Sequence, residues 1–211
     1  MKVSKAQAAE NRAGIVDAAA RLYREHGLAG VGVADITRDA GLTHGGLYRH
    51  FESKDALARE ACLHAFDWTI TPLAALDGPH GDGEADPQAR LQALVHGYLS
   101  SSHRDHPGEG CPAAALAVDA ARAGPEMSEV FAQGVEGNIQ RFARALRPTQ
   151  PADVDPQRPL TPEERATTIA TLATMVGGLV LARATAAGNP ALSEEILATL
   201  RAQLAPQQDQ G

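Results

Sequence analysis

Six side chains that could contact a phosphate or a base edge cluster within residues 43–54. They are Thr43, His44, Tyr48, Arg49, His50 and Lys54. Hydroxyl and cationic groups of these types hydrogen-bond to phosphate oxygens and to base edges in the grooves of DNA. Gly45 and Gly46 lie in the same segment, and each costs a helix about 1 kcal/mol relative to alanine. A close approach of the backbone to another surface would explain the glycines.

The flanking sequence predicts two short helices that meet at a sharp corner. Ile36 and Ala40 lie four residues apart on one apolar stripe, and Gly41 is typical of the left-handed residue that ends a helix. Thr43 is an N-cap whose hydroxyl could accept a backbone N–H of the second helix, expected over about residues 43–50. A helix, a short turn with glycine and a second helix form a helix-turn-helix, which places its second helix in the major groove.

The second helix and the one that follows have clear apolar and capping signals. Leu47, Tyr48 and Phe51 give the second helix a buried stripe, and Ser53 is expected to cap the next helix. Apolar residues at helical spacing extend that next helix to about Leu76. Such a helix would begin beside the DNA contacts and end in a different part of the protein.

The segment from Gly41 to Leu57, GLTHGGLYRHFESKDAL, resembles the DNA-binding signature of TetR-type transcriptional regulators. The resemblance covers about residues 10–60 and weakens afterwards. It implies an all-α fold of about nine helices, in which a three-helix DNA-binding domain precedes a larger ligand-binding and dimerisation domain. The expected domains are residues 1–52 and 53–205, followed by a disordered tail over 206–211.

Within this resemblance, two sets of positions contact DNA. Tyr48, His50 and Lys54 match positions that hold phosphates, and Thr43, His44, Gly45 and Arg49 match positions that face the groove. Gly46 departs from the pattern because it has no side chain at a position that can reach a base. We therefore expect Thr37 or Arg38, on the preceding helix, to add to sequence recognition.

The distribution of charge restricts how the protein could contact nucleic acid. The net charge is −7, but residues 1–60 carry +1 and the remaining residues carry −8. This imbalance predicts weak non-specific binding, so that affinity would depend on a few well-placed contacts and on dimerisation. The sequence has no run of 18 apolar residues and no hydrophobic signal core near Met1, so we expect a cytoplasmic protein with no membrane partner.

Helical spacing and capping residues predict the remaining elements. Helices are expected over about residues 6–26, 87–102, 112–123, 125–147, 161–187 and 193–204, the last capped by Ser193. Loops are expected over residues 77–86, 103–110 and 148–160, because glycine and proline are frequent there.

Two further sets of residues are candidates for small-molecule binding and for dimerisation. The candidate ligand pocket comprises His64, Trp68, Tyr98, Cys111, Met127, Phe131 and Met175, although most of these are also suited to the core. The candidate dimer interface comprises Ile169, Ala173, Val176, Gly177, Val180, Ala184, Ile196 and Leu200. The small residues in this set could instead serve packing within one subunit. The resemblance implies the two-fold interface, and dimers that read two half-sites gain affinity.

Catalytic and metal-binding motifs are not evident in the sequence. It contains no phosphate-binding loop with lysine, no nucleophile elbow and no HExxH, so we predict no enzyme, no cofactor and no metal. His103, His106 and Cys111 lack a fourth ligand and the usual context of a zinc site. Cys111 precedes a helix that starts with proline, so it is either a reactive thiol or a small core residue.

The sequence as a whole favours a homodimeric repressor that binds double-stranded DNA at a palindromic operator. A small-molecule effector would shift the helix that starts at Ser53 and release the DNA. One alternative is a redox- or electrophile-sensing repressor that is triggered through Cys111. Another is a small helical enzyme or binding protein in which the helix-turn-helix is incidental.

Overall fold

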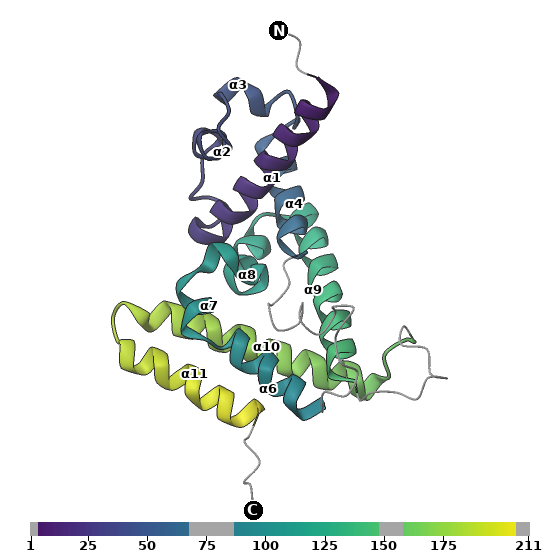
Figure 1. Ribbon diagram of the computed structural model, residues 1–211, viewed down its shortest axis with the longest axis vertical. Coiled ribbons are helices and arrows are strands. Elements are labelled where there is room, and N and C mark those ends of the chain that lie inside the picture. The colour runs from purple at the N-terminus through teal and green to yellow at the C-terminus, as the bar shows by residue number, and fades with distance from the viewer. Residues whose placement is uncertain (1–3, 68–86, 148–157, 206–211) are drawn as a thin grey trace, which may run out of the picture. The chain divides into compact units, whose positions relative to one another are not determined.

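The computed structural model describes residues 4–67, 87–147 and 158–205 (Figure 1). Within these ranges the regular secondary structure is entirely helical, which confirms the all-α prediction. The chain divides into two compact units. Unit 1 comprises residues 1–68 and 106–135, and unit 2 comprises residues 69–105 and 136–211. The division into domains 1–52 and 53–205 remains a prediction.

Unit 1 is built around its first helix. Its elements are α1 (Lys5–His26), α2 (Val33–Asp39), α3 (His44–Leu47), α4 (Lys54–Ala65), the 3₁₀ helix η1 (Pro107–Glu109), α8 (Pro112–Arg122) and the first part of α9 (Pro125–Leu146). Helix α1 contacts α2, α4, η1 and α8. Ile15, Ala19 and Tyr23 lie on its inner face and are almost completely buried, because their spacing places them on one stripe. This stripe is the core on which the other elements of the unit pack.

Helix α4 begins as predicted and ends earlier than predicted. The Ser53 hydroxyl accepts the Ala56 backbone N–H at 3.0 Å, which confirms the predicted cap. The helix ends at Ala65 with Phe66 as its C-cap, so the prediction of a continuous helix to Leu76 is wrong. The spacing of apolar residues could not reveal the end at Ala65, because the same helical spacing continues further along the sequence.

Unit 2 packs its helices against the long helix α10. Its elements are α6 (Pro87–Tyr98), α7 (Ser101–Asp105), the last part of α9, α10 (Pro162–Ala186) and α11 (Pro190–Leu204). Helix α10 contacts α6, α7 and α11, and it buries Leu172, Met175 and Leu179. The capping box predicted at its start is present, since Thr161 and Glu164 each accept the other's backbone N–H.

Three predicted boundaries in and near unit 2 are wrong. The helix expected over 87–102 ends at Tyr98, and the loop expected over 103–110 contains the end of α7 and all of η1. Helix α11 begins at Pro190 with Asn189 as its N-cap, whereas Ser193 is buried and donates its hydroxyl proton to the Ala182 carbonyl at 2.7 Å. The expected loop over 77–86, the tail over 206–211 and most of 148–160 lie outside the described residues.

Helix α10 is the one helix of the described chain that is long and apolar enough to cross a membrane, by length and composition alone. Only 28% of its most apolar 18-residue stretch is buried. Its exposed face includes Ile169, Ala173, Gly177, Val180 and Leu181. A core helix of a globular protein has the same composition, so the property to be explained is the exposed apolar face.

Candidate nucleic-acid interface

The corner after α2 is a closed, hydrogen-bonded turn. The backbone N–H of Leu42 donates to the Thr37 carbonyl at 2.7 Å, and that of Gly41 donates to the Arg38 carbonyl at 3.1 Å. Gly41 has φ +67°, a left-handed conformation that glycine adopts without a Cβ penalty. The two bonds and the left-handed glycine form a Schellman motif, so the structure confirms the helix end predicted at Gly41.

Helix α3 is anchored by the apolar side chains that follow this corner. Leu47 is fully buried and Phe51 is 5% exposed, and α3 contacts α2. The helix covers only His44–Leu47, so it is shorter than the predicted span of 43–50, and hydrogen-bonded turns continue the chain to Phe51. Thr43 is the N-cap, but its hydroxyl makes no capping bond, and the backbone carbonyl of Thr43 accepts the Gly46 N–H at 2.8 Å instead.

The predicted DNA contacts differ in how accessible they are. Tyr48 is 55% exposed, so the prediction that it belongs to the buried stripe is wrong. Arg49, Thr43 and Gly45 are also exposed. His50 is half-buried. His44 is the first residue of α3, and its side chain lies outside the described part of the structure. Leu47 and Phe51 face inward, whereas Tyr48 and Arg49 between them are turned to the outside of the unit.

Lys54 and the two candidates on α2 have partners within the unit. Lys54 is half-buried, and its Nζ donates to the Leu28 carbonyl at 3.3 Å. Thr37 is 2% exposed and donates its hydroxyl proton to the Val33 carbonyl at 3.0 Å, so its side chain faces away from solvent. Arg38 is exposed and pairs with Asp35 at 2.6 Å. Of the two α2 candidates, only Arg38 is placed to reach an external partner.

Arginines of α1 hold the interface elements together, a role that the sequence did not reveal. Arg12 binds both carboxylate oxygens of Glu60 on α4, at 2.5 and 2.6 Å, and its guanidinium carbon lies 4.7 Å from the centre of the Phe51 ring. Arg21 pairs with Asp39 at the end of α2. These contacts join residues 18 or more positions apart. Only positions that vary together in related sequences could have indicated these contacts.

The candidate pocket residues are divided between the two units. His64, Cys111, Met127 and Phe131 belong to unit 1, Tyr98 and Met175 are fully buried in unit 2, and Trp68 lies outside the described residues. His64 lines one hollow of unit 1 and Met127 lines another. Tyr98 and Met175 are therefore core residues in this structure.

Of the metal-ligand candidates, Cys111 is buried, His103 is half-buried and His106 is exposed. Cys111 is 1% exposed and is the N-cap residue of α8. Burial raises the pKa of the Cys62 thiol to about 11. Burial also lowers the pKa of His103 to about 4, against a bond between its Nδ1 and the Tyr98 carbonyl at 2.8 Å that favours the charged form. No three acidic, histidine or cysteine side chains gather into a metal-binding group in the part of the chain that the structure describes.

The helix-turn-helix matches a known family in sequence. Residues 15–61 match the family described as "Bacterial regulatory proteins, tetR family". Residues 15–61 therefore form a domain of the TetR family. This confirms the resemblance seen in the segment from Gly41 to Leu57, and the match contains every candidate DNA contact on α2, α3 and α4.

Individual TetR-family proteins are similar over part or all of the chain. The repressor KstR2 of Mycobacterium tuberculosis is 30% identical over 100 residues, which are 47% of this chain and 48% of that protein. The regulator TtgR of Pseudomonas putida is 35% identical over 92 residues, 44% of this chain and 42% of that protein. The chain thus spans about half the length of the curated relatives it matches. A TetR regulator from Chloroflexus aurantiacus has a similar fold, with a TM-score of 0.67 and 25% identity over 95% of this chain and 97% of that one.

The candidate dimer residues of this TetR-family protein lie on two kinds of surface. Ile169, Ala173, Gly177, Val180 and Ala184 are exposed on α10, and Val176 is half-buried. On α11, Ile196 and Leu200 are half-buried. Leu200 fills the space beside Gly178, where an added Cβ would lie 2.1 Å from Leu200 Cδ1. The small residues of α10 therefore serve internal packing at Gly178 and leave an open face at Gly177.

Proposed function

We propose that this TetR-family protein is a ligand-responsive transcriptional repressor that binds double-stranded DNA through α3 and the turn after it. The observation that carries the proposal is the exposed segment between two buried anchors. Leu47 and Phe51 fix the backbone, while Tyr48 and Arg49 are turned outward. Tyrosine and arginine both donate hydrogen bonds to phosphates, and arginine also reads guanine in the major groove.

A mobility-shift assay with the promoter of the adjacent gene tests this interface. We expect Tyr48→Phe and Arg49→Ala each to weaken binding about tenfold, because one charge-assisted bond to DNA is worth about 1 to 3 kcal/mol. Arg122→Ala is the matched control, since Arg122 is an exposed arginine on α8, which lies in the same unit. Unchanged affinity of both α3 variants at moderate salt would refute the assigned surface. Weakening by Arg122→Ala alone would place the DNA on α8.

We further propose that the protein acts as a homodimer that pairs the exposed apolar face of α10. Ile169, Ala173, Gly177, Val180 and Ala184 recur every three or four residues and therefore form one stripe. A Cβ added at Gly177 would meet no atom within 4 Å, so the stripe has room for close approach by a second helix. A self-complementary stripe of this kind suits a two-fold interface, which would also present two α3 segments to a palindromic operator.

Light scattering after size-exclusion chromatography tests the dimer. Val180→Glu places a charge in the middle of the stripe, and we expect the variant to be a monomer with reduced operator affinity. Thr167→Glu is the control, because it adds the same charge to an exposed position of α10 beyond the stripe. A Val180→Glu protein that stays dimeric would place the interface elsewhere.

The effector and the route of its signal complete the proposal. The names of the relatives, a repressor and a regulator, support control of transcription by this chain. We propose that it does so as a cytoplasmic protein without enzymatic activity. Helix α4 starts directly after the α3 anchors, so a shift of α4 would move α3. An effector releases DNA only if it binds the two states with different affinity, and a difference of about 5.5 kcal/mol would change a 1:99 population to 99:1. Fluorescence titration with the substrates and products of enzymes encoded by the neighbouring genes would identify the effector.

A further inference from the structure

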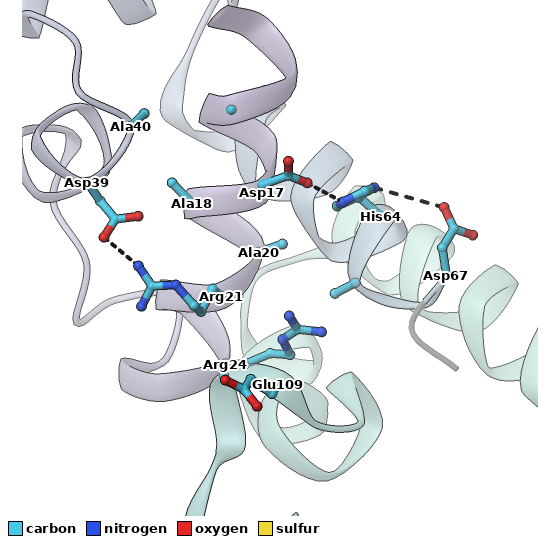
Figure 2. Close-up of a pocket in the computed structure, with 13 residues that line it drawn as sticks. Asp17, Ala18, Ala20, Arg21, Arg24, Asp39, Ala40, His64, Asp67 and Glu109 are labelled. Atoms are coloured by element: carbon cyan, nitrogen blue, oxygen red, sulfur yellow. Dashed lines mark hydrogen bonds and ion pairs between the residues drawn. The ribbon is translucent and has the colours of Figure 1, made fainter. Parts of the chain in front are cut away.

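A hollow of about 720 Å³ lies along α1 within unit 1 (Figure 2). Its lining includes the small residues Ala18 and Ala20 of α1. The end of α2, the end of α4 and η1 supply charged side chains around them. Its volume is typical of sites for small organic molecules. All lining residues belong to unit 1, whose elements position α3.

Most charged groups around the hollow already have partners. The Asp17 carboxylate lies 2.6 Å from Nε2 of His64, and Arg21 pairs with both Asp39 and Glu25. Figure 2 shows these pairs at opposite sides of α1, where they join α1 to α4 and to α2. They account for the folding of the unit and need no further ligand.

Arg24 is different from Arg21, although both line the same hollow. Its Nη1 donates to the Gly110 carbonyl at 3.2 Å, but its Nε is buried and has no hydrogen-bond partner among the described residues. No carboxylate of the described chain lies within ion-pair distance of it. Burial lowers the pKa of the Arg24 guanidinium, and this effect exceeds the opposing attraction of Cys111, Glu25 and Glu109. A buried donor of this kind is costly unless something outside the chain pairs with it.

The wall beside Arg24 is tightly built. Gly108 of η1 is buried, and an added Cβ would lie 2.2 Å from the Glu25 carboxylate. Gly110 is also buried and holds Nη1 of Arg24. The Gly110 carbonyl, directly after η1, thus restrains the guanidinium and reduces the entropy that would be lost when a ligand binds.

We propose that this hollow binds a small organic monocarboxylate, whose carboxylate pairs with Arg24 and whose apolar body lies on the alanines of α1. A planar guanidinium matches the two oxygens of a carboxylate. Asp17, Asp39 and Glu109 also line the hollow and repel ligands with several negative charges, such as inorganic phosphate. The site would report the presence of an acid directly to the unit that carries α3.

Titration calorimetry on the full-length protein tests the site with benzoate as the probe and benzamide as its uncharged counterpart. We expect benzoate to bind at least tenfold more tightly than benzamide, because only benzoate has a negative charge that can pair with the Arg24 guanidinium. Arg24→Gln should weaken benzoate binding about tenfold or more. Arg59→Gln is the matched control, since Arg59 is in the same unit but pairs with Glu126 outside this hollow, and it should change benzoate affinity less than about twofold. Circular dichroism of both variants checks that they fold.

Four results would overturn the proposal. Equal binding of benzoate and benzamide would show that the charge of the ligand is irrelevant. Unchanged benzoate affinity in a folded Arg24→Gln protein would place the probe elsewhere. Inorganic phosphate that binds more tightly than benzoate in an Arg24-dependent way would make the site a phosphate site. Absence of benzoate binding up to about 10 mM would show that the unpaired guanidinium does not recruit a carboxylate. None of these results depends on whether the protein binds DNA.

Discussion

Replacing Gly45 by alanine separates the stability of α3 from its proposed contact with DNA. A Cβ at Gly45 would meet no atom within 4 Å, and the residue is exposed with no left-handed φ. Alanine should therefore stabilise the folded protein by about 0.5 to 1 kcal/mol, because glycine loses more backbone entropy in a helix. For a chain of this size the melting temperature should rise by about 1 to 4 °C. Folding alone thus favours alanine at a position where the chain has glycine.

The proposed interface supplies the missing reason, because a duplex close to the α3 backbone would leave no room for a methyl group. We expect Gly45→Ala to lower operator affinity at least tenfold, or about 1.4 kcal/mol, while it raises the melting temperature. Gly137→Ala is the control, since Gly137 is also helical and also meets no atom within 4 Å, but lies on α9. It should stabilise the protein and leave affinity unchanged. A Gly45→Ala protein that binds the operator normally would refute the close approach.

Two further predictions concern stability. Gly134→Ala on α9 should destabilise the protein by about 1 to 3 kcal/mol in urea unfolding. A Cβ there would lie 2.2 Å from the Phe66 ring, and the opposite sign from Gly137→Ala on the same helix makes the comparison decisive. Hydrogen bonds from Arg158 and from the Thr161 backbone lower the pKa of Glu164 to about 2, below its ordinary value of 4.5. The stabilisation is complete above pH 4.5 and is lost as the pH falls towards 2, so Glu164→Gln should flatten the fall of the melting temperature over that range.

Short-range signals predicted where several helices begin or end. Gly41 ends α2, Ser53 caps α4 and Thr161 caps α10 as expected, because each cap is a bond between residues a few positions apart. Ser193 shows where this reasoning stops. It has the residue type and spacing of an N-cap, yet its hydroxyl bonds to the Ala182 carbonyl on a different helix. The hydrogen bond from Ser193 to another helix replaces the local capping bond that the sequence predicts.

The order of residues alone therefore determined the all-helical fold, the corner at Gly41 and the polar segment that follows it, because turn chemistry and helical periodicity are local properties. Tertiary structure decided which polar groups remain available to a partner. Thr37 is enclosed and Arg12 is occupied by Glu60, while Arg38 stays at the surface and the buried Nε of Arg24 has no hydrogen-bond partner among the described residues. Burial and pairing depend on segments that are distant in the chain, and no pattern within a single helix encodes them.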